Sequence, residues 1–305
     1  MADEKERGRF VRFFIMELLF LRIQYDRFVI KREYINDAES WSLKSLRKYD
    51  NSNKVKYVNT FSSNDSEEES EDHAAKAIRL LEAMFHVSAP TQIYKHWLNA
   101  VLYAVYREEA REEAITRSAL REQLYDLARC FMLDVYLAGE GKVHGFEEIV
   151  FRERYEPKNR IEEINWELID CGCNVHNFVF NFYDFVTWET DPKKYSEFDL
   201  TYRTSVEHFY PQKPMEGYPP LKEEVLNCFG NLCLISRGMN SKFSNNMPKA
   251  KLNNFGRIKE VRNGLSLKLL EMMDVVEHEG NWGVREILAF DERAKRRIQD
   301  ALSQH

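Results

Sequence analysis

The feature that most constrains the fold of this chain is a Glu207-His208 pair followed, 23 and 32 residues after the histidine, by Asn231 and Asn240. Residues 198–206 alternate between apolar and polar side chains, and Pro211 follows the pair. Alternation is typical of a half-buried strand, and proline ends such a ladder. The spacing therefore predicts a strand, a long loop, a returning strand over 230–236 and a short helical turn over 237–242.

These residue types are suited to hydrolysis of a phosphodiester, which needs an activated water and neutralisation of charge on the phosphate. A histidine such as His208 can act as the base because its neutral form is abundant near pH 7. Carboxylate and amide oxygens, as in Glu207 and Asn240, suit a hard cation such as Mg²⁺ or Mn²⁺. Consecutive strand residues point to opposite faces, so Glu207 and His208 converge only if the chain bends between them. The break at Pro211 favours such a bend.

Charge is unevenly placed along the chain. The net charge of −6 does not indicate a general nucleic-acid binder, but residues 201–262 carry ten Lys and Arg against five acidic residues. A phosphate-facing surface produces such a segment, and so does an ordinary solvated face. Charge alone does not separate these two readings.

Three stretches carry a resemblance to a known family: Tyr202-Arg-Thr-Ser-Val-Glu-His-Phe-Tyr-Pro-Gln212, Leu226-Asn-Cys-Phe-Gly-Asn-Leu-Cys-Leu-Ile235 and Asn240-Ser-Lys-Phe-Ser-Asn245. They resemble the His-Me finger (HNH) nucleases in their His-Asn-Asn form. More closely, they resemble the C-terminal nuclease half of GmrSD-type modification-dependent (type IV) restriction endonucleases. The upstream stretches 180–188 and 28–34 are also similar to that family.

The resemblance implies a role for each motif residue. His208 is expected to be the general base, Glu207 and Asn240 the metal ligands, and Asn231 the amide that holds the hairpin loop. Contacts to phosphate or nucleic acid are expected from Arg237, Lys242, Asn245, Lys249 and Lys251. The implied cofactor is Mg²⁺ or Mn²⁺, and the implied substrate is DNA, in the restriction of modified or phage DNA.

One departure from the family bears on partners. Members commonly carry an N-terminal nucleotide-hydrolysing domain with an Asp-Gly-Gln-Gln-Arg-type motif, and this chain has no such stretch. We therefore expect the nuclease subunit of a split system, or part of a longer polypeptide, with a separate nucleotide-hydrolysing subunit or domain as its partner. Two alternatives stay open: a catalytically silent scaffold subunit of a defence complex, and a metal-dependent RNase. The intact motif argues against the first, but nothing separates DNA from RNA, because such sites engage phosphates.

The expected fold class is α+β and mainly helical, with a helical N-terminal region followed by a ββα-metal (His-Me finger) nuclease core flanked by helices. The expected domains are an N-terminal helical segment (1–58), an acidic linker (59–73), a helical region (74–195) and an HNH-like nuclease domain with C-terminal helices (196–305).

Local patterns predict the individual elements. Helices are expected over 8–34, 74–86, 91–112, 114–138, 264–277 and 283–303. Asp72 and Thr91 are candidate N-caps, and Gly139 is a candidate stop signal. Residues 140–160 read as loops and short strands, and the aromatic run 175–188 as buried. The helix over 8–34 is apolar on most sides, which predicts burial in a bundle or against a partner.

Cysteine usage and hydropathy indicate a cytoplasmic protein. Five cysteines do not form a disulfide framework for 305 residues, so a reducing compartment is expected. Cys171, Cys173 and His176 lack the Cys-x-x-Cys spacing of a zinc ribbon, which disfavours structural zinc. Charged residues interrupt the apolar stretch 9–30 before the roughly 18 apolar residues that a membrane span needs. No small-residue cleavage site follows it, so no signal peptide and no membrane association are expected.

Overall fold

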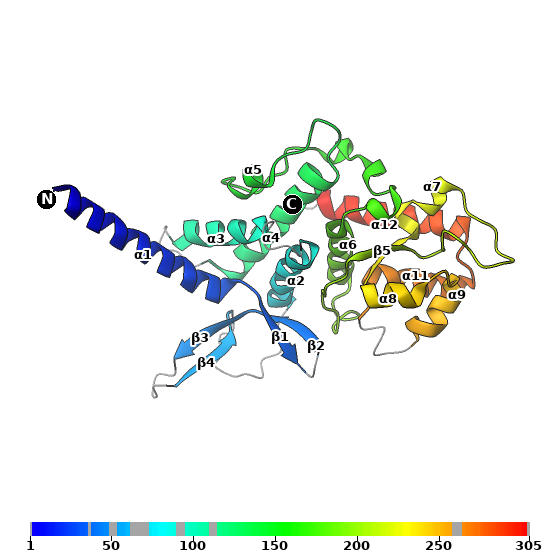
Figure 1. Cartoon of the computed structure of the whole chain (residues 1–305), viewed down its shortest axis with the longest axis horizontal. Helices are drawn as coiled ribbons and strands as arrows, with labels where there is room; N and C mark the ends of the chain where they lie inside the picture. Colours follow the sequence, from blue (N-terminus) through cyan, green and yellow to red (C-terminus); the bar gives the residue numbers. More distant parts are fainter. Residues whose placement is uncertain are drawn as a thin grey trace.

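The computed structural model describes residues 2–35, 38–48, 54–61, 73–89, 95–109, 115–257 and 264–303. Most of the predicted acidic linker and the candidate caps Asp72 and Thr91 lie outside these residues. The described part of the chain is mainly helical with small antiparallel sheets, in agreement with the predicted α+β class (Figure 1).

The helices outside the predicted hairpin are α1 (Ala2–Phe28), α2 (His73–Ser88), α3 (His96–Glu109), α4 (Arg117–Phe131), α5 (Phe146–Val150), α6 (Asn177–Thr190), α11 (Leu267–Glu279) and α12 (Val284–Ser303). A π-helical turn, η2 (Met132–Tyr136), extends α4, and short 3₁₀ turns follow at η3 (Ile161–Glu163), η4 (Trp166–Leu168) and η5 (Gly172–Asn174). The predicted helices over 74–86, 91–112, 114–138, 264–277 and 283–303 are confirmed, with ends shifted by a few residues.

Residues 31–35, 38–42, 44–48 and 55–59 form four strands, paired two by two, that the sequence pattern did not predict. Strand β1 (Lys31–Ile35) pairs with β2 (Ala38–Ser42), and β3 (Lys44–Lys48) pairs with β4 (Val55–Asn59). These strands are short and polar, so they show little of the alternation between apolar and polar residues that predicts a strand. A distant contact holds them: the buried Trp41 indole N–H donates to the Leu200 carbonyl at 2.7 Å.

Helix α1 ends at Phe28, whereas the apolar pattern predicted a helix to residue 34. The cause is tertiary, because the Ile30 amide donates to the Glu82 carboxylate of α2 at 2.7 Å. Glu82 has no exposed surface, and this burial raises its pKa to about 8. A contact from another helix therefore sets where α1 stops.

The predicted burial of this helix within the chain's own bundle is wrong. Phe10, Phe13 and Met16 are 67%, 62% and 61% exposed, and α1 projects away from the body of the molecule (Figure 1). Only its C-terminal end packs, beside α3 and β3. Within the described residues, no segment covers the apolar side chains of its first five turns.

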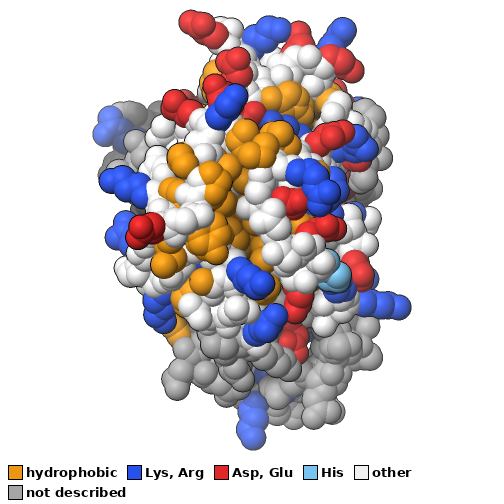
Figure 2. All heavy atoms as spheres, turned by 90° about the vertical axis from the view of Figure 1, so that its right-hand side faces the viewer, with side chains coloured by type: hydrophobic (Ala, Val, Ile, Leu, Met, Phe, Trp, Pro, Cys, Tyr) orange, Lys and Arg blue, Asp and Glu red, His pale blue; other side chains and the backbone are white. Residues whose placement is uncertain are grey.

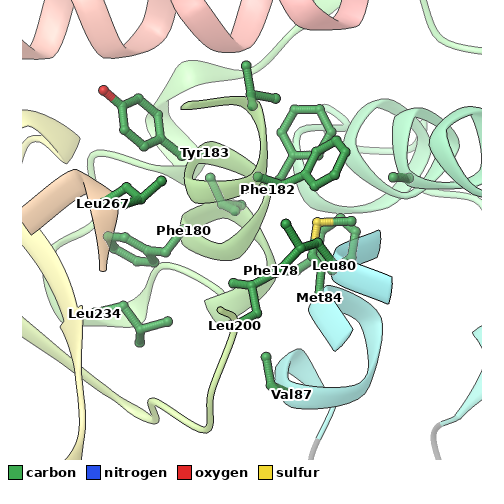
Figure 3. Close-up of a cluster of buried hydrophobic side chains, with 14 of the residues drawn as sticks. Leu80, Met84, Val87, Phe178, Phe180, Phe182, Tyr183, Leu200, Leu234 and Leu267 are labelled. Carbon is green, nitrogen blue, oxygen red and sulfur yellow. The ribbon is translucent and has the colours of Figure 1, made fainter. Parts of the chain in front are cut away.

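Helix α6 joins the two halves of the core, as expected from its aromatic run. Figure 3 shows that Phe178 lies beside Leu80 and Met84 of α2, while Phe180 faces the side of Leu234 and Leu267. Burial of large aromatic side chains on both sides contributes most of the apolar area of this region. The helix ends at Thr190, and Asp191 caps it.

Two further predictions about local structure need correction. Residues 140–160 contain helix α5 and no strand. The strand predicted over 198–206 is shorter and later, because β5 covers only Ser205–His208. No described helix is both long enough and apolar enough to span a bilayer.

The predicted hairpin is present. Strand β5 pairs antiparallel with β6 (Leu232–Ile235), with Ser205 opposite Ile235 and His208 opposite Leu232. Helix α8 (Arg237–Phe243) follows directly, and the Ser236 hydroxyl caps it by accepting from the Met239 amide at 3.2 Å. The short elements α7 (Glu223–Leu226), η6 (Phe229–Asn231), α9 (Pro248–Lys251) and η7 (Leu252–Gly256) complete this region. Strand, loop, strand and helix thus follow in the predicted order.

Candidate active site

His208 occupies the end of β5 and is only 7% exposed. Its Nε2 lies 2.9 Å from the Asn227 side-chain oxygen. Because a carbonyl oxygen only accepts, Nε2 carries the proton and Nδ1 keeps its lone pair. With the proton on Nε2, Nδ1 accepts a weak hydrogen bond from the Cys173 thiol at 3.8 Å. The imidazole is therefore held in the tautomer whose Nδ1 is the acceptor, and an attacking water would replace the Cys173 thiol as the donor to it.

The position of Asn227 depends on a glycine in η5. Gly172 has a φ of +63°, and its amide donates to the Asn227 carbonyl at 3.1 Å. A Cβ at position 172 would lie 2.8 Å from the Asn227 side-chain oxygen, closer than real contacts allow. Only glycine combines this backbone conformation with this approach. Sequence reasoning missed Asn227 and Cys173, since neither stands out by pattern.

Glu207 and Asn240 are linked through a serine. The Ser205 hydroxyl donates to the Glu207 carboxylate at 3.3 Å, and the Asn240 amide nitrogen donates to the Ser205 oxygen at 2.7 Å. Helix α8 thus returns Asn240 to the β5 side chains, as the spacing predicted. The amide oxygen of Asn240 accepts no hydrogen bond from the described residues.

The donor set at this position fits a hard cation. A carboxylate, an amide oxygen and a hydroxyl are the oxygen ligands that Mg²⁺ and Mn²⁺ accept, and sulfur and imidazole are absent from the set. Among the described residues, no three His, Cys, Asp or Glu side chains form a metal-binding group. A Mg²⁺ ion held by Glu207 and Asn240 would therefore keep several water ligands, as this ion commonly does.

The predicted bend between Glu207 and His208 does not occur. Both residues belong to the ladder, opposite Cys233 and Leu232, and the chain leaves the strand only after His208. Their side chains therefore leave β5 on opposite faces. Cys173 of η5 lies on the His208 side, where its sulfur is 3.8 Å from Nδ1. Burial and then the charge of Glu207 raise the pKa of its thiol.

Asn231 is fully buried beneath the turn that follows His208. Its oxygen accepts from the Tyr210 amide at 2.8 Å and from the Trp282 indole at 3.2 Å. Its nitrogen donates to the carbonyls of Tyr210 at 3.2 Å and Leu226 at 3.0 Å. With both donors and its acceptor satisfied, the Asn231 side chain holds this turn rigidly.

Lys251 differs from its predicted placement on a phosphate-facing surface. It is 1% exposed, and its ammonium donates to the carbonyls of His208 and Phe209, each at 2.9 Å. A second buried lysine, Lys268, donates to the Phe229 carbonyl at 2.6 Å on the other side of the hairpin. Burial lowers the pKa of each ammonium to about 8. Because its donors are already used by the backbone, Lys251 positions the turn and does not offer a surface charge.

The other predicted phosphate contacts lie on the surface. Arg237 and Lys242 are exposed on α8, the helix that carries Asn240, and Lys249 is exposed on α9. Asn245 is exposed in the turn after α8. In the part of the chain that the structure describes, none of the three cations forms an ion pair. They border the Glu207 side of the hairpin with positive charge.

Comparison with known proteins gives one match. Residues 167–292 match the family described as GmrSD restriction endonucleases, C-terminal domain. The matched segment includes α6, the hairpin with His208, α8, α9 and the first part of α12. No curated protein and no solved structure matches the chain. Residues 167–292 are therefore identified as a domain of the kind that forms the C-terminal part of GmrSD restriction endonucleases.

Proposed function

We propose that this protein is a metal-dependent endonuclease of the HNH type that hydrolyses DNA phosphodiester bonds in the restriction of modified or phage DNA. The family supports a nuclease. The observation that carries the finer proposal is the hydrogen bond from His208 Nε2 to Asn227, which leaves Nδ1 as a proton acceptor. Phosphodiester hydrolysis requires a base and oxygen ligands for a hard cation, and β5 carries His208 and Glu207 as consecutive residues.

In this proposal, His208 Nδ1 takes the proton of the attacking water while Asn227 keeps the ring oriented. Asn231 and Lys251 keep the turn in place, so that the base does not move as charge develops on it. Glu207 and Asn240 would hold the Mg²⁺ or Mn²⁺ ion, which when bound neutralises charge on the phosphate. Arg237, Lys242, Asn245 and Lys249 are the proposed contacts to the DNA backbone.

We expect the purified protein to nick or linearise plasmid DNA with Mg²⁺ or Mn²⁺ and to lose this activity completely in EDTA. The reason is that oxygen ligands bind these ions reversibly, and in the proposed mechanism the ion neutralises charge on the phosphate. Gel electrophoresis of plasmid and of a structured RNA, incubated in parallel, measures the outcome. Cleavage that survives thorough chelation contradicts the metal assignment. Cleavage of RNA alone favours the RNase alternative, and cleavage of neither favours a silent scaffold.

A partner for α1 is part of the same proposal. A helix whose side chains Phe10, Phe13 and Met16 are all more than 60% exposed is typical of a contact surface. We propose that it docks a separate nucleotide-hydrolysing protein or domain, which makes cleavage selective. The isolated chain should then cut modified and unmodified plasmid at similar rates, in an assay paired with light scattering. A stable monomer that cleaves only modified DNA contradicts this proposal.

A further inference from the structure

The loop that leaves the turn after His208, residues 209–222, has a rigid backbone. It contains four prolines, Pro211, Pro214, Pro219 and Pro220, each of which restricts the chain. The Tyr210 hydroxyl donates to the Pro219 carbonyl at 2.7 Å and so closes the base of the loop. Within it, the Tyr218 amide donates to the Met215 carbonyl at 3.1 Å, around Gly217 with a φ of +90°.

The tip of this loop presents apolar side chains to solvent. Met215 is 49% exposed and Tyr218 is 53% exposed, and Lys213 and Lys222 beside them are exposed as well. Figure 2 faces the end of the molecule that carries the loop and α7, and shows hydrophobic side chains gathered across it with both cationic and acidic side chains around them. Glu216, Glu223 and Glu224 are exposed here too, so charge does not select the ligand of the tip. An exposed aromatic ring on a rigid loop is, however, a platform on which an unpaired base can stack.

Hydrogen bonds of Tyr210 connect the loop tip to the turn that carries the proposed base, His208. Tyr210, two residues after His208, is held through its backbone by Asn231 and through its hydroxyl by the loop. The carbonyl that the Tyr210 hydroxyl binds belongs to Pro219, the residue after Tyr218, so the loop tip lies next to Tyr210. A nucleic acid whose phosphate is bound at His208 therefore passes within reach of the loop tip.

We propose that Tyr218 stacks on an unpaired nucleobase close to the scissile phosphate, with Met215 packing against the same base or its neighbour. The ligand class is a nucleic acid with a locally unstacked base, either single-stranded or a distorted duplex. This proposal rests on the proposed nuclease function and adds a substrate preference to it. Base stacking on an aromatic side chain contributes about 1–3 kcal/mol, and side-chain wedges act where base steps open. The hydrogen bond that joins the loop to Tyr210, in the turn after His208, favours nucleic acid over a protein partner.

The test is binding of two short DNA duplexes that contain 2-aminopurine, one with this base unpaired and one with it fully paired. Ca²⁺ replaces Mg²⁺ so that binding is measured without cleavage. Stacking on Tyr218 should quench the fluorescence of the unpaired base, and the unpaired duplex should bind about tenfold more tightly. Tyr218→Ser should remove both effects, while Tyr218→Phe should retain them. Tyr57→Ser is the matched control, because Tyr57 is 59% exposed on the distant strand β4.

The outcomes separate this inference from the proposed function. If Tyr218→Ser keeps the quenching and the preference, Tyr218 does not stack on the base and the inference is wrong. If wild-type protein cleaves plasmid but binds both duplexes equally, the inference fails while the nuclease function stands, and the tip is then a surface for a protein. If wild-type protein neither binds DNA nor cleaves plasmid, the proposed function fails and the inference fails with it.

Discussion

His208→Ala is expected to lower the rate of DNA cleavage by about 10²–10⁴-fold, the usual contribution of a general base. The side chain is the proposed proton acceptor, and its Nδ1 is the ring nitrogen that does not carry the hydrogen bond to Asn227. The fold should survive, because Lys251 binds the backbone carbonyl of His208 and not its ring. Single-turnover cleavage of plasmid measures the rate, and urea unfolding checks the stability.

Two companion variants sharpen this experiment. Asn227→Ala removes one hydrogen bond from the ring, so a smaller loss of roughly tenfold is expected. His278→Ala is the matched control, because His278 is exposed on α11 away from the hairpin, and its activity should equal that of the wild type. A folded His208→Ala protein that cleaves at nearly the wild-type rate would remove the proposed mechanism.

Arg203→Met is expected to destabilise the protein by about 3–5 kcal/mol, the range observed when one partner of a buried ion pair is removed. Arg203 and Asp184 are 2% and 1% exposed, and their charged groups lie 3.7 Å apart. That distance is too long for a hydrogen bond, so the attraction is mainly between charges. The guanidinium also donates to the Gly264 carbonyl at 3.2 Å and thereby ties the lead-in to β5 to the segment before α11. Urea unfolding of both proteins measures the difference.

The loss of stability caused by Arg203→Met should depend on pH. Burial raises the pKa of Asp184 to about 6 from 3.8, against the opposing charge of Arg203, so loss of Arg203 raises it further. A carboxyl with a raised pKa contributes stability at low pH and loses it as the pH rises through the folded value. Arg203→Met should therefore cost more at about pH 8 than at about pH 5. Arg296→Met, which removes a 67% exposed cation paired with the 73% exposed Glu292, should cost less than about 1 kcal/mol at either pH. Equal effects of the two substitutions would show that the buried pair is not stabilising.

Sequence reasoning reached the hairpin because its signals are local. Alternation, Pro211 and the apolar run at 232–235 predict strand, break and returning strand, and the structure pairs β5 with β6 in that order. The long helices α6, α11 and α12 carry dense apolar patterns, which are the most reliable local signals. The start of β5 was misplaced because residues 198–204 alternate without having a neighbouring strand to pair with.

A single sequence does not predict the contacts around His208. Asn227 and Cys173 come from separate segments, and only the φ of Gly172 and the close packing of η5 on β5 bring them to the ring. Lys251 was assigned to the surface because a lysine in a basic segment is usually solvated. Lys251 can be buried because its ammonium donates to the backbone carbonyls of His208 and Phe209, which point into the interior.

Residue types and spacing were enough to predict the family motif, the order of strand, loop, strand and helix in the hairpin, and the burial of the aromatic run 175–188. The reason is that residue type, spacing and periodicity are local properties of the chain. Only the tertiary structure decided where α1 ends, that its apolar surface stays exposed, and which nitrogen of His208 can accept a proton. Each of these depends on a contact between distant residues, namely Glu82 with Ile30 and Asn227 with His208, or on the absence of a covering segment among the described residues.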